Sequence, residues 1–500
     1  MGSVTQGLAQ TDVSLSRLRE REPHVTVGVC GSTLSLTFPP RAVEGTLRQA
    51  LGNERKLLLR SPTSACLILR QIGLTRKELP IQVADVTPET AIPETPAFQP
   101  DSRQAWTRLA LALVVGSLGS VGMWSVVVIL PAVQADFAAT RGAASLAFTF
   151  TMVGFGIGGV IVGRLTDRFG IVASIALATV LMAIGYVLSA STSALWQFIL
   201  LHLLIGAGSS ATFAPLMAEA SHWFERKRGI AVALAATGSY IGGTFWPPVV
   251  SWGMLNFGWR STQIGIAVVT TVLTLVTLAI LRAKMGANER RSHANAPPPK
   301  VDLQLSHNAL TAILFIAGIG CCVAMAMPQV HIVAYCSDLG YGAARGAEML
   351  SVMLALGIIS RVGSGFLADR IGGLRTLLVG AIAQGVALMF YLFFDGLSSL
   401  YIISAMFGLF QGGIVPAYAI IVREAMPASQ AATRVGIVIL GTIGGMSLGG
   451  WLSGVIFDAT GSYRAAFVNG IAWNLFNVAI VTWLLLRARK RTMMTLRPAE

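Results

Sequence analysis

Arg361 is the residue whose surroundings say most about chemistry, because it interrupts an otherwise apolar run from Met353 to Gly365. A guanidinium inside a membrane costs at least ~2.5 kcal/mol on insertion scales, so it faces a cavity or a partner. Its flat fork of donors suits a carboxylate, which it can hold through two hydrogen bonds. Every other lysine or arginine can be assigned to a loop, a helix end or the N-terminal segment. Arg361 is therefore the candidate binding residue for an organic anion, and snorkelling to the interface is the alternative.

His331 is a second candidate, because its imidazole would lie near the outer end of another apolar run and titrates near neutral pH. It would bind substrate or pass a proton there, and an interfacial histidine bonded to a loop explains it equally well. Three further side chains within the apolar runs are candidates for a pocket wall, namely Trp124, Tyr240 and Gln411. The sequence predicts no metal site, no cofactor and no enzyme, since it has no metal-ligand spacing, nucleotide loop or nucleophile with a base.

An eight-residue pattern, GxLxDRxG, occurs twice, at 163–170 and 365–372. Each copy lies on a short polar turn between two apolar runs, which places its Asp and Arg at helix ends. These charges would pair with neighbouring helix ends and separate during a conformational change, or they are merely solvated loop charges. Two glutamates at matching places in the repeat are expected to form salt bridges at the same gate. The predicted gating residues are Gly163, Asp167, Arg168, Gly170, Gly365, Asp369, Arg370, Gly372, Glu219 and Glu424.

Composition indicates a membrane protein, with the lipid bilayer as its solvent. Apolar residues make up 54% of the chain, charged residues only 12%, and the mean hydropathy is +0.67. A span needs roughly 20 apolar residues, and twelve such runs can be laid down. This predicts an all-α bundle of twelve transmembrane helices at 108–130, 144–163, 171–190, 195–218, 228–251, 262–282, 308–332, 346–366, 374–394, 399–422, 434–456 and 465–486.

The net charge of +14 reports orientation, because basic residues gather in the loops on the side of the two repeated motifs. The opposite loops hold only Arg141, Arg260, Arg345 and Arg464. Lysine and arginine favour the cytoplasmic side, so the motif side and both termini are predicted to be cytoplasmic, in the cell (inner) membrane. Nucleic-acid binding is not supported, since the basic residues form no surface interleaved with aromatic residues.

The loops also divide the chain. Residues 1–104 lack a span and are expected to form a largely disordered cytoplasmic extension; a small regulatory module and sequence upstream of the true start are the alternatives. Short apolar patches there, such as 25–30, would suit a few strands or one helix. The remaining predicted segments are a six-helix half at 105–283, a polar and proline-rich central loop at 284–306, a second six-helix half at 307–490 and a tail at 491–500.

Taken together, these features resemble the major facilitator superfamily over residues 105–490. A narrower resemblance, to the monocarboxylate transporters and their bacterial relatives such as the oxalate/formate antiporters, rests on Trp223–Ala231, on Gly258-Trp259-Arg260 and on their echoes at Arg434 and Tyr463. The resemblance implies two pseudo-symmetric halves that rock about a midplane site, a monomeric functional unit, and an arginine in span eight that binds the substrate carboxylate. In this chain that arginine is Arg361.

The resemblance also leaves alternatives. Animal monocarboxylate transporters carry an aspartate one turn before the arginine that is implicated in proton coupling, whereas this chain has Gly357. Symport with protons, exchange for a counter-anion and uniport therefore all remain open. A monocarboxylate is the predicted substrate, because a dicarboxylate would want a second buried cation. Efflux of drugs or other small molecules by the same fold is an alternative, and a non-transporting membrane sensor is an alternative of another class.

Reporter fusions test the predicted orientation. A fusion after Lys284 and another after Arg491 should both report the cytoplasm, because the basic loops lie on that side. Alkaline phosphatase and green fluorescent protein fusions measured side by side give opposite signals for the two compartments. A periplasmic signal at either position would overturn the orientation.

Overall fold

The structure is a computed structural model that describes residues 24–29, 32–37, 101–224, 228–283 and 305–495. The chain forms two compact units, which divide between Thr95 and Pro96. In the first unit, the described residues form an antiparallel hairpin of β1 (His24–Val29) and β2 (Ser32–Thr37). The apolar patch near Val25 thus forms a strand. The remaining predictions for the N-terminal extension, for most of the central loop and for the last five residues lie outside the described residues.

The second unit is helical throughout its described part. Its first half contains α3 (Arg103–Gly119), α4 (Val121–Asp136), α5 (Arg141–Phe169), α6 (Ile171–Ala190), α7 (Leu195–Ser209), the short 3-10 helix η2 (Ser210–Thr212), α8 (Ala214–Trp223) and α9 (Arg228–Ala283). Its second half contains α10 (His307–Asp338), α11 (Ala343–Ile371), α12 (Gly373–Phe393), α13 (Leu397–Gln411), α14 (Ile414–Ala425), α15 (Ala428–Thr460) and α16 (Tyr463–Thr495).

Eleven described helical segments are long and apolar enough to cross a bilayer, and one of them supplies two crossings. This segment, Ile230–Leu281, has 52 residues, so it would measure roughly 78 Å as one straight helix against a hydrocarbon core of about 30 Å. Gly258 breaks it with a φ of 77°, and Gly253 packs against Thr262 across the turn. Its two legs are the predicted fifth and sixth spans, which confirms the all-α, twelve-span fold.

The fourth and tenth spans are each broken near the middle, at matching places in the two halves. The first half separates α7 from α8 at Phe213, and the second half separates α13 from α14 at Gly412 and Gly413. Pro215 and Pro416 follow these breaks in the first turn of the next helix, where a missing backbone N–H does no harm. The matching breaks are what a duplicated six-helix unit produces.

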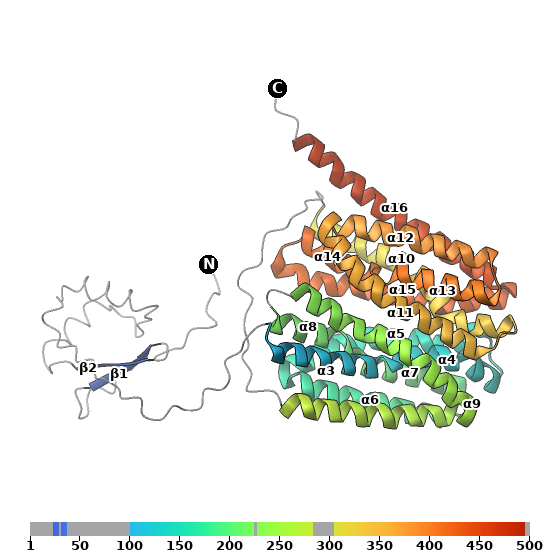
Figure 1. Cartoon of the computed structure of the whole chain (residues 1–500), viewed down its shortest axis with the longest axis horizontal. Coiled ribbons are helices and arrows are strands. Elements are labelled where there is room, and N and C mark those ends of the chain that lie inside the picture. The colour runs from blue at the N-terminus through green and yellow to red at the C-terminus, as the bar shows by residue number, and fades with distance from the viewer. Residues whose placement is uncertain (1–23, 30–31, 38–100, 225–227, 284–304, 496–500) are drawn as a thin grey trace. The chain divides into compact units, whose positions relative to one another are not determined.

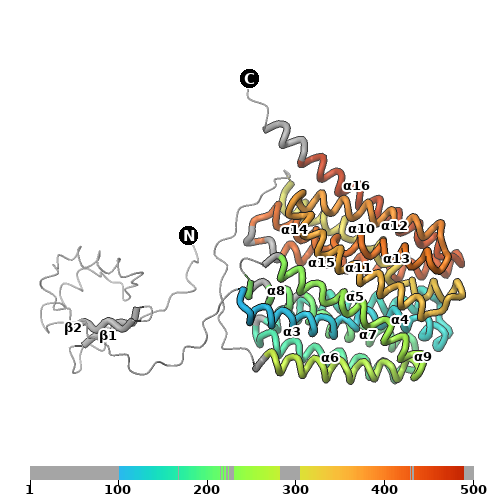
Figure 2. Tube along the Cα trace, in the orientation of Figure 1, coloured from blue at the N-terminus to red at the C-terminus, as the bar shows by residue number. Residues whose placement is uncertain are grey.

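Figure 1 shows the first half, in blue to green, beside the second half, in yellow to red. Figure 1 also shows that α3 starts at the end of the bundle toward which α16 runs, and Figure 2 traces the same path. Both GxLxDRxG segments are at that end, where α5 and α11 finish. We call it the motif end, and we call the opposite end, where α5 begins and α15 finishes, the far end. Large apolar side chains such as Leu255 and Trp196 cover the outer faces, as contact with lipid requires.

Glycines let helices cross closely at equivalent points of the two halves. A Cβ added at Gly206 of α7 would overlap the carbonyl oxygen of Thr151 on α5, and one added at Gly408 of α13 would overlap that of Met353 on α11. Lipid gives helices no hydrophobic reason to associate, so such close backbone contact supplies much of the packing energy.

We expect Gly206→Ala and Gly408→Ala each to lower the free energy of unfolding by on the order of 3 kcal/mol, because the added methyl group must push two backbones apart. Thermal melting of the purified protein in detergent measures the loss. Gly265→Ala is the matched control, since nothing lies within 4 Å of a Cβ at that position. Equal melting temperatures for all three variants would contradict the close crossing.

Candidate functional site

Arg361 lies on α11 where this helix packs against α9 of the other half, and only 4% of it is exposed. Its Nη1 donates to the carbonyl oxygen of Ala236 at 2.7 Å, and its Nε donates to that of Gly412 at 3.2 Å. Ala236 belongs to the first half and Gly412 to the second. The guanidinium therefore connects the two halves in the interior of the bundle.

The Tyr240 ring covers this guanidinium, with the Arg361 Cζ 4.2 Å from the ring centroid. The ring fits because residue 357, one turn before Arg361, is glycine: a Cβ there would overlap the Tyr240 ring. An aromatic face attracts a cation by about 0.5 to 2 kcal/mol, more when the pair is desolvated. Tyr240 thus occupies the space in which a larger side chain at position 357 would lie.

Trp124 and Gln411 lie beside this cluster without contacting the guanidinium through a described hydrogen bond. The Trp124 Nε1 donates to the carbonyl oxygen of Ser239, next to Tyr240. The Gln411 Oε1 accepts a hydrogen bond from Gln329, and its Nε2 is buried with no hydrogen-bond partner among the described residues. Since Gly412 follows Gln411 directly, this free donor is close in sequence to the carbonyl that holds Arg361. Four of the five predicted binding residues, Arg361, Tyr240, Trp124 and Gln411, therefore gather in the same region.

His331, the fifth, belongs to a different cluster near the far end. Its side chain is fully buried; Nδ1 lies 3.2 Å from the Tyr463 hydroxyl and Nε2 lies 2.7 Å from the carbonyl oxygen of Gly450. A neutral ring that donates from Nε2 and accepts at Nδ1 satisfies both contacts. Both ring nitrogens of His331 thus have hydrogen-bond partners in this conformation. The apolar residues around His331 in the sequence did not indicate these partners.

The two motifs end their helices in the same way. Gly170 and Gly372 have φ angles of 82° and 83°, in the left-handed region that favours glycine, and they terminate α5 and α11. Arg168, Asp369 and Arg370 are exposed and form no ion pair with any described residue. The Asp167 side chain and residues 225–227 lie outside the described part of the chain.

The two predicted gate glutamates have different partners. Glu219 forms an ion pair with Arg108 at 2.5 Å, and the Trp223 ring lies 3.9 Å from the Arg108 guanidinium. Glu424 accepts a hydrogen bond from the backbone N–H of Gly373 at 3.0 Å, at the N-terminus of α12, where a carboxylate is favourable. Arg108 and Glu219 both belong to the first half, and Glu424 and Gly373 to the second, so neither contact joins the halves in this conformation.

Arg361 is not the only buried arginine, although the sequence placed the others at helix ends or in loops. Arg108 is 5% exposed and Arg141 is 8% exposed. Both do lie near helix ends, but each folds back onto an aromatic ring and a carboxylate: Trp223 and Glu219 for Arg108, and Phe457 and Asp338 for Arg141. Buried partners of this kind come from helices distant in sequence, so spacing along the chain could not reveal them.

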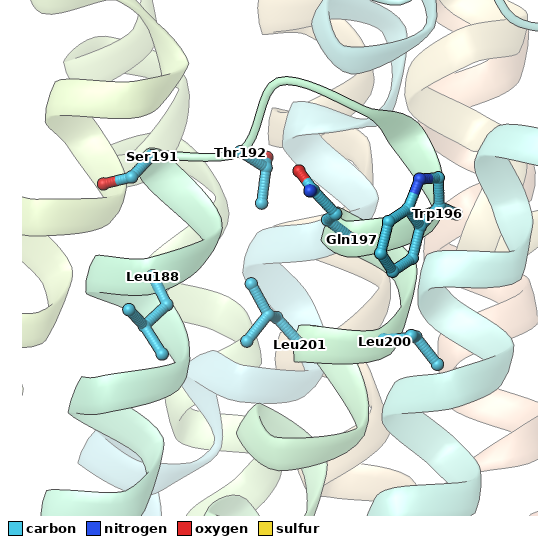
Figure 3. A pocket seen from close by; sticks show the side chains of 7 residues that line it. All are labelled: Leu188, Ser191, Thr192, Trp196, Gln197, Leu200 and Leu201. Carbon is cyan, nitrogen blue, oxygen red and sulfur yellow. The ribbon is translucent and has the colours of Figure 1, made fainter.

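A groove of about 420 Å³ lies elsewhere, between α6 and α7 at the far end. Figure 3 shows Ser191, Thr192 and Gln197 toward one side of this groove and three leucines toward the other. None of its lining residues contacts Arg361. The groove faces outward from the bundle, so it is a separate surface feature.

Comparisons with known proteins agree with this architecture. The family model described as Major Facilitator Superfamily matches residues 112–400 and 362–499. Monocarboxylate transporter 13 of Rattus norvegicus is 28% identical over 364 residues, covering 71% of this chain and 82% of that protein. Agnestins efflux protein of Paecilomyces divaricatus is 26% identical over 280 residues, covering 55% and 63%. The crystal structure of nucleoside transporter NupG superposes with a TM-score of 0.59 at 12% identity, covering 75% of this chain and 99% of that one.

Substitutions at Tyr240 test the stacking on Arg361. Tyr240→Ala should lower the free energy of unfolding by about 3 kcal/mol, because it empties a buried site and removes the aromatic face from the guanidinium. Tyr240→Phe keeps the ring and should lower the free energy of unfolding by only about 1 kcal/mol, the cost of one lost hydrogen bond. Thermal melting in detergent compares the two. Equal losses in both variants would show that the hydroxyl group, and not the ring, is what matters.

Proposed function

The chain belongs to the Major Facilitator Superfamily, and from that premise we propose that it is a secondary transporter of a small organic monocarboxylate, with Arg361 as the residue that binds the carboxylate. It is a multi-pass membrane transporter and not an enzyme. Monocarboxylate transporter 13 covers most of the chain, which supports a carboxylate as the substrate.

The observation that carries the proposal is a contrast among three buried arginines. Arg108 has Glu219 as a counter-ion and Arg141 has Asp338. Arg361 has two backbone carbonyls and the Tyr240 side chain, but no carboxylate, among the described residues. Carbonyl dipoles and a ring satisfy part of a guanidinium but do not neutralise it, and an unneutralised charge in a membrane is expensive. On this proposal, the transported substrate supplies the carboxylate that neutralises Arg361.

Arg361 has donors left for such an anion. A guanidinium carries five N–H groups, and the contacts with Gly412 and Ala236 use one on Nε and one on Nη1. One N–H on Nη1 and two on Nη2 remain, which is enough for a two-pronged grip on a carboxylate. These remaining N–H groups suit a substrate with one carboxylate. Among the described residues, a second carboxylate would lack a buried arginine to bind it, because Arg108 and Arg141 already pair with Glu219 and Asp338.

Binding at Arg361 would be coupled to the rocking motion, because its Nη1 donates to Ala236 of the other half. A carboxylate held by the remaining Nη donors would draw the guanidinium toward itself and so weaken its hydrogen bond with the Ala236 carbonyl of the other half. A ligand can shift a conformational equilibrium only by interacting differently with the two states, and this weakening supplies such a difference.

Position 357 excludes one coupling route. Residue 357 is a glycine with the Tyr240 ring against it. The position one turn before Arg361 therefore has no carboxylate that could carry a proton. We propose that coupling, to protons or to a counter-anion, depends on other groups.

We further propose that the motif end is cytoplasmic and that the protein resides in the cell membrane, as the distribution of basic residues indicates. The exposed Asp369 and Arg370, and their counterparts in α5, would form their ion pairs when the motif end closes. Gating by these motifs then belongs to the conformation in which the motif end is closed. Efflux of another organic molecule is the second candidate function, which the Agnestins efflux protein supports.

Arg361→Lys should lower substrate affinity roughly ten- to a hundredfold, because a lysine cannot reproduce the two-pronged contact although it keeps the charge. Uptake of radiolabelled monocarboxylates and dicarboxylates into proteoliposomes, with and without a pH gradient, measures affinity, substrate class and coupling together. Arg345→Lys is the matched control, since Arg345 is exposed and its ion pair is with Glu348 of its own helix.

Two results would count against the proposal. Unchanged affinity and rate in Arg361→Lys would make Arg361 a structural residue. Wild-type uptake restricted to uncharged or cationic compounds would favour efflux of another class. Reconstituted protein must be quantified in each case, so that a loss of transport is not a loss of protein.

A further inference from the structure

Arg141 joins the two halves at the far end through three hydrogen bonds of its side chain. It begins α5 in the first half, and its two terminal nitrogens donate to both carboxylate oxygens of Asp338, which ends α10 in the second half. Its Nη1 also donates to the Tyr463 hydroxyl at 2.9 Å, and its Nε donates to Gln134 at 3.1 Å. A two-pronged, largely buried ion pair of this kind is among the stronger polar contacts in proteins.

A second carboxylate of the second half holds the backbone of the same helix end. Asp458, near the end of α15, accepts hydrogen bonds from the backbone N–H groups of Arg141 at 2.9 Å and Gly142 at 2.7 Å. The first N–H groups of a helix have no partner within the helix, and its N-terminus carries partial positive charge. Asp458 therefore satisfies α5 from across the boundary between the halves.

Tyr463 and His331 hold the partners in place. The Tyr463 hydroxyl accepts from Arg141 and can donate to the His331 Nδ1, while the His331 Nε2 donates to the carbonyl oxygen of Gly450. Every polar atom of the two side chains is thereby used. This gives His331 a role that differs from substrate binding: it fixes the hydroxyl group that receives Arg141.

The contact between α5 and α15 weakens steadily from the far end to the motif end. Residues 142, 149, 156 and 163 of α5 are seven apart and so share one face. A Cβ at Gly142 would be 2.9 Å from Val455, Thr149 exchanges two hydrogen bonds with Ser447, and a Cβ at Gly156 would be 3.5 Å from Leu440. A Cβ at Gly163 would have nothing within 4 Å.

The boundary between α9 and α11 shows the same trend. Leu354 contacts Gly243, Gly357 contacts Tyr240 and Arg361 reaches Ala236, whereas Gly365 has nothing within 4 Å of a Cβ. In the described residues, the two halves thus touch at the far end and the middle and separate toward the motif end.

From this geometry we propose that Arg141, Asp338, Asp458 and Tyr463 form the gate that closes the far end, and that breaking it is a required step for the site to open there. Such a gate does not depend on the identity of the substrate and would act for any cargo. Rocking the halves must separate Arg141 from both carboxylates at once, so the strength of this gate sets the balance between the two conformations.

Distances between spin labels test the gate without any substrate. In a background with the five cysteines replaced by alanine, Ala135→Cys on α4 and Ala459→Cys on α15 place labels on exposed far-end positions of the two halves. Arg141→Gln should add a longer-distance population and raise the ratio of open to closed far ends by about tenfold or more, because charge-assisted contacts are lost. Double electron–electron resonance in lipid nanodiscs measures that ratio.

The chain offers a matched control. Arg260 pairs with Asp136 at 2.6 Å, also at the far end, but both residues belong to the first half. Arg260→Gln should therefore leave the distance distribution unchanged. The charge-swapped pair Arg141→Asp with Asp338→Arg should recover part of the closed population, since it restores attraction between the halves.

Asp338→Asn and Tyr463→Phe provide milder changes in case Arg141→Gln does not fold, and each should shift the ratio in the same direction by a smaller factor. An unchanged distribution in the folded Arg141 variant, or in both milder variants, would overturn the gate. An equal shift in Arg260→Gln would also overturn the gate, because the loss of any charge at the far end would then produce the same change. Failure of carboxylate uptake would leave these outcomes untouched, so the gate and the substrate proposal can fail separately.

Discussion

The cost of burying a charge away from water is the constraint on which this structure depends. Each buried arginine among the described residues must find compensation within the protein, and the chain solves this in three ways. Arg108 stays within one half and takes Glu219, whereas Arg141 reaches across the halves for Asp338. Arg361 takes carbonyl oxygens and the Tyr240 ring. The two that cross between the halves hold the conformation together, and the one without a carboxylate suits an anion that comes and goes.

The remainder of the fold makes those contacts possible. Within each half, helices cross at glycines, such as Gly206 against Thr151 and Gly408 against Met353. The two backbones touch at these points, so one helix cannot shift without displacing the other, and each half is a rigid body. The halves also cross closely at the far end, where a Cβ at Gly454 would lie 2.9 Å from the Gly142 Cα. Their other contacts are polar: Arg141 and Arg361 reach across the boundary, and the Thr149 and Ser447 hydroxyls each donate to the other residue's backbone carbonyl. These polar contacts can be exchanged for water or substrate. Rigid halves joined by exchangeable contacts are the requirement for rocking motion.

Sequence reasoning could predict the features that depend on local pattern. The lengths of apolar runs gave twelve spans, and the duplicated motif placed Gly170 and Gly372 at helix ends. The burial of Arg361 followed from its apolar neighbours. Pairings between distant helices could not be predicted in this way. Asp458 satisfies α5 although 317 residues separate it from Arg141, and His331 bonds to Tyr463 and Gly450 because of how three helices cross. The spacing of residues along the sequence does not indicate such contacts between distant helices.

The fit of Tyr240 against Gly357 has a consequence for how related transporters can diverge. A carboxylate at position 357 cannot simply be added, because its Cβ would meet a ring supplied by the opposite half. A lineage that gains an acidic group there must also shrink or displace residue 240, and one that keeps an aromatic residue at 240 must keep a small residue at 357. Residues 240 and 357 should therefore change together. Whether the central site can hold an acidic side chain at position 357 thus depends on residue 240 of the opposite half.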